Sequence, residues 1–190
     1  MTIRISRFTG MVYRAHHPMW SYDPLSGNGA KKHGGRFNRP GCAALYLSLD
    51  PTTAWMEAQQ GFPFKPQPMT LVAYEVDCAK IADLNDEQLL QNIGSSSQVL
   101  GCAWEDLATQ AMEPPTWRLA DQLRALDVAG ALVRSFASGC TAKNQNLVLW
   151  HWSDAASNTV RVIDDFGRLP KTPESWQANP PGAVMEEKAT

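Results

Sequence analysis

Residues 34–58, GGRFNRPGCAALYLSLDPTTAWMEA, carry an arginine, a tyrosine and a glutamate on three successive expected elements. Arg36 follows two glycines in a loop, and Tyr46 lies in a short apolar run typical of a buried strand. Glu57 lies two turns inside a helix that an Asp-Pro pair predicts. Because elements that are consecutive in sequence usually pack side by side, the three side chains could line one cleft.

These residue types suit one reaction, the cleavage of a bond between a ribose and a planar cationic ring. An arginine can form two parallel hydrogen bonds to a phosphate or a ribose, and glycines before it allow a ligand close to the backbone. A tyrosine ring can stack on a pyridinium. A carboxylate can stabilise an oxocarbenium-like transition state. Taken singly, the same residues are better explained as a solvated loop charge, a core aromatic and an exposed helix residue.

The periods expected of a strand and a helix predict which way two of these side chains point. Strand alternation turns Tyr46 away from Leu45 and Leu47, so the tyrosine faces a cleft if the leucines enter the core. On the following helix, Glu57 shares a face with the alanines three residues before it and one residue after it. Small neighbours leave room for a ligand beside the carboxylate.

Composition narrows the class of protein. The 190 residues are 44% hydrophobic, enough to bury one substantial core. A net charge of -2 disfavours a nucleic-acid partner. The sequence contains no run of about 18 apolar residues and no signal-peptide pattern, so we expect a cytoplasmic protein without membrane contact. Four separated cysteines and four scattered histidines predict neither a disulfide framework nor a metal site.

The pattern along the chain predicts strands at both ends and helices between them, an α+β fold in a single domain. Expected strands cover residues 11–15, 43–48, 69–77, 130–135, 146–152 and 159–163. Expected helices cover residues 51–60, 85–93, 103–112 and 116–126. We expect residues 16–41 to form a long functional loop without secondary structure. Its glycines lead into a strand, which excludes a Rossmann or P-loop phosphate site.

Five segments together resemble the RES-domain family, named for its arginine, glutamate and serine. They are VYRA, DPLSGNGAKKHGGRFNRPG, ALYLSLDPTTAWMEA, LVRSFASG and NLVLW. The likeness covers about residues 11–152, and SGxGAxxxGGRFNxxG is its most specific part. It implies an ADP-ribosyltransferase-like fold with a mixed or split β-sheet core and clustered helices. We expect a catalytic domain over residues 1–168 and a Pro-rich tail, an arm or partly disordered, over residues 169–190.

The resemblance also implies roles for individual residues. The site residues it assigns are Arg14, Gly35, Arg36, Tyr46, Glu57 and Ser135. The two arginines would hold pyrophosphate or ribose, the tyrosine would stack on nicotinamide and the glutamate would stabilise the ribosyl cation. The serine would hydrogen-bond the substrate. LVRSFASG departs from the PSxR-like pattern expected around this serine, so Ser138 remains an alternative to Ser135.

The function that the resemblance implies is that of a toxin in a bacterial toxin–antitoxin pair. Such a toxin consumes NAD as a substrate, by hydrolysis or phosphorolysis, and releases nicotinamide. A protein ADP-ribosyltransferase is the first alternative, although Trp55 and Met56 stand where protein-modifying members of the wider fold often carry Glu or Gln. A catalytically inactive binding module is the second. The implied partner is a separate helix-turn-helix antitoxin of the Xre type that covers the cleft, in an assembly that can contain a toxin dimer.

Overall fold

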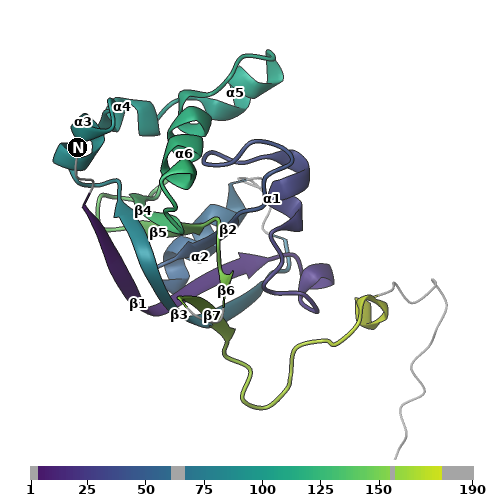
Figure 1. Ribbon diagram of the computed structural model, residues 1–190. Coiled ribbons are helices and arrows are strands. Elements are labelled where there is room, and N and C mark those ends of the chain that lie inside the picture. The colour runs from purple at the N-terminus through teal and green to yellow at the C-terminus, as the bar shows by residue number, and fades with distance from the viewer. Residues whose placement is uncertain (1–3, 61–66, 155–156, 177–190) are drawn as a thin grey trace, which may run out of the picture.

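Seven β-strands in the described part of the chain form one mixed sheet (Figure 1). The computed structural model describes residues 4–60, 67–154 and 157–176. The strands are β1 (Ile5–His16), β2 (Leu45–Ser48), β3 (Thr70–Asp83), β4 (Gly130–Arg134), β5 (Gln145–Leu149), β6 (Ser153–Asp154) and β7 (Asn158–Val162). Their order is β1-β2-β5-β4-β3-β7-β6, and β1 also pairs with β3. The first five strands in this order therefore close into a ring.

The pairings within the ring differ in length and direction. The β3–β4 pair is parallel, and β1–β2, β2–β5, β4–β5 and β1–β3 are antiparallel. β1 and β2 meet at one registered pair, Tyr13↔Ser48, whereas β1 follows β3 along almost its whole length. The ring is thus well paired everywhere except at the seam between β1 and β2.

The helices of the described residues confirm the predicted α+β class. They are α1 (Asn28–His33), α2 (Pro51–Gln59), α3 (Glu87–Asn92), α4 (Ser97–Leu100), α5 (Trp104–Thr109) and α6 (Pro115–Ala125), with 3-10 helices η1 (Pro18–Trp20) and η2 (Pro173–Trp176). The four helices from α3 to α6 lie together above β4 and β5 in Figure 1. They follow one another between β3 and β4, where the sequence pattern predicted three helices; α4 was not predicted.

Strands β1 and β3 are longer than predicted. We expected strands at residues 11–15 and 69–77, but β1 and β3 pair as far as Ile5↔Ala82. The sequence pattern found the parts with clear apolar alternation, and most of the added residues of β1 are exposed or half-buried. Their extended conformation comes from pairing with a distant strand, which a local pattern does not report.

Residues 16–41 contain α1 and η1, so the expectation of a long loop without secondary structure is wrong. The usual start signal is missing, because α1 has no side-chain hydrogen bond at its N-cap. The loop that follows α1 donates hydrogen bonds to carbonyl groups of the helix. Asn38 Nδ2 donates to the carbonyl of Ala30 at 2.8 Å, and the backbone N–H of Gly41 donates to the carbonyl of Lys31 at 2.7 Å.

Two apolar clusters lie on opposite sides of β2, β4 and β5. The inner cluster fills the ring with Val12, Leu45, Leu47, Val72, Tyr74, Val76, Cys78, Ile81, Ala129, Leu147 and Leu149. The outer cluster joins these strands to α3, α4 and α6, and Tyr46 packs against it. The alternation predicted for β2 is therefore confirmed: Leu45 and Leu47 point into the ring, and Tyr46 points away from it.

Helix α2 begins where the Asp-Pro pair predicted. Asp50 Oδ1 accepts a hydrogen bond from the backbone N–H of Thr53 at 2.8 Å, and Pro51 occupies the first turn, where no donor is needed. The helix lies against β1 and β2 and carries Glu57 in its second half. The Asp50 cap thus fixes the start of the helix that positions the carboxylate.

The segment after β7 packs on the ring. Asp164 accepts hydrogen bonds from the backbone N–H groups of Arg168 and Leu169, and Leu169 contacts the inner cluster. Helix η2 then lies near η1. Residues 177–190 of the predicted tail lie outside the described residues.

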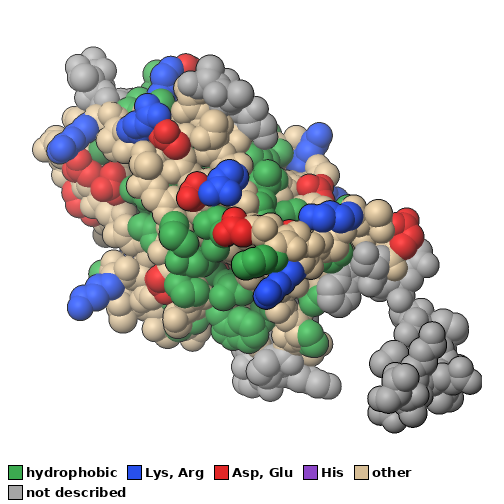
Figure 2. Space-filling view, turned by 90° about the horizontal axis from the view of Figure 1, so that it is seen from below, with side chains coloured by type: hydrophobic (Ala, Val, Ile, Leu, Met, Phe, Trp, Pro, Cys, Tyr) green, Lys and Arg blue, Asp and Glu red, His purple; other side chains and the backbone are tan. Residues whose placement is uncertain are grey.

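The surface seen from below Figure 1 has a central group of hydrophobic side chains bordered by charged ones (Figure 2). Several basic side chains on this face lie beside acidic ones. Within residues 4–60, 67–154 and 157–176, no helix has both the length and the apolar character needed to cross a membrane.

Candidate active site

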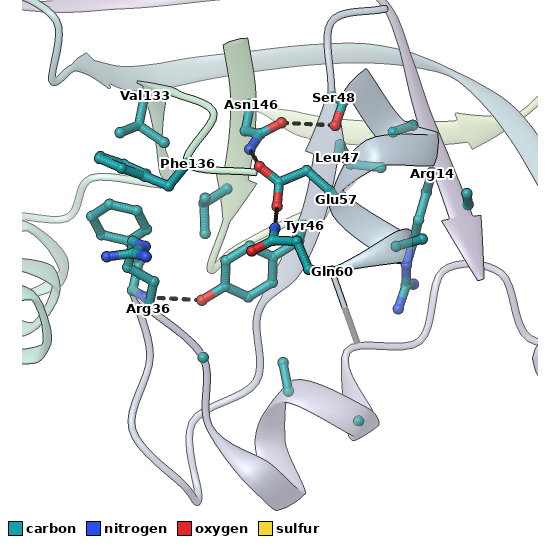
Figure 3. Close-up of a pocket in the computed structure, with 18 of the residues that line it drawn as sticks. Arg14, Arg36, Tyr46, Leu47, Ser48, Glu57, Gln60, Val133, Phe136 and Asn146 are labelled. Atoms are coloured by element: carbon teal, nitrogen blue, oxygen red, sulfur yellow. Dashed lines mark hydrogen bonds between the residues drawn. The ribbon is translucent and has the colours of Figure 1, made fainter. Parts of the chain in front are cut away.

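A cavity of about 510 Å³ opens between α2, the glycine loop before β2, and the ends of β1, β4 and β5. Five of the six residues assigned to the site line it: Arg14, Gly35, Arg36, Tyr46 and Glu57. Its volume lies in the range of small-molecule sites, roughly 300–1,000 Å³. Figure 3 shows Tyr46 and Glu57 in the middle of the cavity wall, with Arg36 and Arg14 on opposite sides of them.

The carboxylate of Glu57 is held by three uncharged donors. Ser135 Oγ donates to its Oε1 at 2.5 Å, and Asn146 Nδ2 donates to the same oxygen at 2.5 Å. Gln60 Nε2 donates to Oε2. Asn146 is fixed in turn by Ser48 Oγ, which donates to its Oδ1 at 2.7 Å (Figure 3). These bonds orient the carboxylate, and none of them cancels its charge.

The two candidate serines occupy different environments. Ser135 is 7% exposed, accepts a hydrogen bond from the backbone N–H of Ala137 at 3.2 Å and donates to Glu57. Ser138 is exposed. Ser135 lies behind Glu57 and is not part of the cavity wall, so its contact in this structure is with the carboxylate.

The hydroxyl of Tyr46 is already engaged by the glycine loop. It accepts a hydrogen bond from the backbone N–H of Phe37 at 2.9 Å and donates to Asn38 Oδ1 at 2.8 Å. Burial raises the pKa of this phenol well above its ordinary value, so it stays neutral. The hydroxyl anchors the loop, and the ring faces the cavity.

Gly35 is required by the close approach of the loop to this tyrosine. A Cβ at Gly35 would lie 2.6 Å from Tyr46 Oη and 2.8 Å from Asn38 Oδ1. The preceding Gly34 has φ +77°, a conformation that side chains rarely adopt. The glycines were expected to let a ligand approach the backbone, and in this structure the group that lies close to Gly35 is the Tyr46 side chain.

Arg36 links the glycine loop to the turn between α4 and α5. Its Nη1 donates to the carbonyls of Leu100 at 3.1 Å and Cys102 at 2.6 Å, and its guanidinium stacks 4.4 Å from the ring centroid of Phe136. Burial lowers the pKa of this guanidinium from its ordinary value. Arg36 is therefore not a solvated loop charge. Among the described residues, its Nε and Nη2 have no hydrogen-bond partner.

Arg14 lies at the end of β1, across the cavity from Arg36 (Figure 3). Its Nη1 donates to the carbonyls of Pro24 at 3.3 Å and Ser26 at 3.0 Å. Burial lowers the pKa of this guanidinium as well. Backbone carbonyls orient the group without neutralising it.

Of the arginines described, most of those on the surface form ion pairs, and those of the cavity wall do not. Surface arginines pair with carboxylates in Arg7–Asp77, Arg39–Asp121, Arg118–Glu113, Arg124–Asp121 and Arg161–Glu75. Within the part of the chain that the structure describes, Arg14, Arg36 and Arg134, all in the cavity wall, form no ion pair. Partly desolvated cations without partners are costly, and an anionic ligand would offset that cost.

Several residues of the site were not predicted from the sequence. Asn146 and Gln60 hold Glu57, while Phe136 and Arg134 form the wall beside Arg36. Asn146 gave one usable signal, because it is a polar residue at the start of the apolar run NLVLW. Its contact with Glu57 depends on the pairing of β2 with β5, which places it opposite Ser48.

Comparison with protein-family models matches the RES domain over residues 11–172, so the chain belongs to the RES-domain family. The match extends beyond residue 152, where the sequence resemblance ended. A search of curated proteins found no significant match.

Among solved structures, the fold is similar to that of a chain in the crystal structure of the M. tuberculosis MbcT–MbcA toxin–antitoxin complex. The TM-score is 0.59 at 19% sequence identity, and the alignment covers 84% of each chain. At this identity the likeness establishes a shared fold.

Proposed function

We propose that this RES-domain protein is the toxin of a toxin–antitoxin pair and cleaves the bond between nicotinamide and ribose in NAD. The observation that carries the proposal is the carboxylate of Glu57, which faces the cavity and is oriented by neutral donors alone. Its charge is therefore available to a cation that forms in the substrate. The unpaired arginines of the same cavity suit the phosphates of NAD.

In the proposed reaction, the bond between ribose C1′ and the ring nitrogen breaks, and both electrons leave with nicotinamide, which becomes neutral. The ribose passes through an oxocarbenium-like state that the negative charge of Glu57 stabilises. Water or phosphate forms the new bond to C1′, and attacking water releases a proton to solvent. Ser135 and Asn146 keep the carboxylate in place during this step, and Tyr46 offers its ring face to nicotinamide.

Transfer of ADP-ribose to a protein is the weaker alternative. Met56, directly before Glu57, lies near the β4–β5 loop, with its Sδ 3.8 Å from Cys140 Sγ. Trp55 is 40% exposed and is not part of the cavity wall. Neither residue offers a carboxylate or an amide to an acceptor, which favours hydrolysis or phosphorolysis.

The implied partner is a separate antitoxin. The similarity to a chain of a toxin–antitoxin complex supports such a partner, and the resemblance to the family suggests a protein of the Xre helix-turn-helix type that covers the cavity. A toxin dimer within the complex is part of the same proposal.

The test is to incubate the purified chain with NAD, with and without phosphate, and to identify the products by mass. We expect free nicotinamide together with ADP-ribose or its phosphorylated form. Glu57→Gln should bind NAD but lose about 10²-fold or more in rate, as for other lost electrostatic stabilisers. Equal rates for the two proteins would refute the role of Glu57, and binding without turnover in both would favour an inactive binding module.

A further inference from the structure

Two arginines share one aromatic ring in the wall of the cavity. The guanidinium carbon of Arg36 lies 4.4 Å from the ring centroid of Phe136, and that of Arg134 lies 4.9 Å from the same centroid. All three residues line the cavity. Arg36 is half-buried and Arg134 is exposed, so the stack leads from the inside of the cavity to solvent.

The stack brings like charges together without neutralising them. Burial is the main cause that lowers the pKa of Arg36; the charge of Glu57 raises this pKa, and the charge of Arg134 lowers it by a smaller amount. The face of a phenyl ring attracts each cation but carries no net charge. Neither arginine forms an ion pair with a carboxylate of the described residues. A ligand that brings negative charge to both guanidinium groups would remove this repulsion.

We propose that Arg134 is a substrate-binding residue and that Arg36, Phe136 and Arg134 form a subsite for a phosphate group, the two-arginine subsite. Phe136 holds both guanidinium groups over its ring, and a guanidinium can form two parallel hydrogen bonds to phosphate oxygens. Arg36 retains its unpaired Nε and Nη2 for this contact, because its backbone bonds use Nη1. The inference rests on the proposed function, in which the substrate carries phosphates.

The phosphate group has two possible sources, which the same chemistry would recognise. It is either the diphosphate of the dinucleotide or free inorganic phosphate that acts as the acceptor. In both cases the subsite binds and positions the group without covalent change. A mutation of Arg134 should therefore weaken either dinucleotide binding or phosphate binding, and the two effects can be measured separately.

The chain contains a matched control for a stacked arginine. Arg168 lies over Phe166, with its guanidinium carbon 5.0 Å from the ring centroid, and neither residue lines the cavity. Arg134→Ala and Arg168→Ala each remove an arginine from the face of a phenylalanine. A binding loss specific to Arg134→Ala then cannot come from the loss of a stacked cation in general.

The experiment measures binding by calorimetry to the full chain carrying Glu57→Gln, with ADP, adenosine and inorganic phosphate as separate ligands. We expect Arg134→Ala to weaken ADP binding about tenfold, the typical effect of one lost hydrogen bond to a charged group, and to leave adenosine binding unchanged. If inorganic phosphate alone binds more weakly, the subsite holds the acceptor. Arg168→Ala should bind all three ligands like the parent.

Unchanged binding of both ADP and phosphate in Arg134→Ala would overturn the proposal, and so would a parent that binds neither. Arg134→Gln serves as a second variant and should show the same loss, with melting temperatures confirming that both variants fold. The proposed function fails separately, if the wild-type chain does not consume NAD. If ADP binding depends on Arg134 but the wild-type chain does not consume NAD, the proposed subsite stands and the proposed reaction is refuted.

Discussion

Replacing Asn146 by alanine tests whether the orientation of Glu57 contributes to catalysis. Asn146 Nδ2 donates to Glu57 Oε1 at 2.5 Å, and Ser48 Oγ donates to Asn146 Oδ1 at 2.7 Å. The variant removes one of the two donors to this oxygen and leaves Ser135 in place. A hydrogen bond to a charged group contributes about 1.5–3 kcal/mol. Because one donor remains, we expect the lower end of this range, a fall in kcat of about tenfold with KM for NAD little changed.

The same substitution also affects stability, and the assay must separate the two effects. Ser48 is 3% exposed, so its hydroxyl loses a buried acceptor, at a cost of about 1–3 kcal/mol. For a chain of this size, each kcal/mol lowers the melting temperature by about 2–4 °C. Rates of NAD consumption should therefore be measured well below the melting temperature of the variant.

Asn144→Ala is the matched control. Asn144 Nδ2 donates to Thr53 Oγ1 at 2.7 Å, and its Oδ1 accepts a hydrogen bond from the backbone N–H of Thr141 at 2.9 Å. It lies two residues from Asn146, and its side-chain hydrogen bonds within the described residues go to Thr53 and Thr141 instead of Glu57. We expect Asn144→Ala to lower the melting temperature to a similar extent while kcat stays near the parent value. An equal fall of kcat in both variants would show that Asn146 acts through stability alone.

Three further substitutions test other parts of the structure. Arg36→Lys should lower both the turnover of NAD and the melting temperature, since a lysine lacks the planar group that lies over Phe136 and the further N–H donors beside the Nη1 that binds two backbone carbonyls. An unchanged melting curve would show that these contacts contribute no stability. Gly35→Ala should destabilise the fold by about 1–3 kcal/mol through overpacking against Tyr46, whereas Gly29→Ala, with open space at the Cβ position, should not; chemical denaturation compares the two. The two ring nitrogens of His16 are buried and have no hydrogen-bond partner among the described residues, and burial lowers the pKa of the ring to about 4. As the pH falls, the histidine of the unfolded chain is therefore protonated before that of the folded chain, and the free energy of unfolding decreases between about pH 6.5 and pH 4. After allowance for solvent screening we expect a loss of about 2 kcal/mol or less, and melting curves of His16→Leu should show a weaker dependence on pH in this window.

Local signals predicted the elements that carry the three central residues. The Asp50 cap gave the start of α2, and apolar alternation gave the side of β2 that Tyr46 faces. The two glycines before Arg36 indicated a backbone that another group approaches closely, although the group seen at Gly35 is Tyr46 and not the expected ligand. Each of these features depends on residues within a few positions of one another.

Features that depend on distant segments were not predictable in this way. Asn146 contacts Glu57 because β2 pairs with β5. The two residues are 89 positions apart in the sequence, so no local pattern predicts their contact. Arg36 was expected to be free for a ligand, but its Nη1 donates to two carbonyls at the turn between α4 and α5, whose position depends on tertiary packing. Helix α1 lacks a side-chain hydrogen bond at its N-cap, and the bonds from the loop after it to its carbonyls join residues whose contact no capping pattern reports.

The seam between β1 and β2 gives the ring of strands a mechanical weak point beside the carboxylate. Tyr13↔Ser48 is the registered pair of this seam, and Ser48 is also the residue that fixes Asn146. Backbone amides here should exchange with solvent through local opening at a lower free energy than those between β1 and β3. A ligand that contacts both Arg14 on β1 and Tyr46 on β2 would tie the two strands together, so occupancy of the cavity and slow amide exchange at the seam are thermodynamically linked.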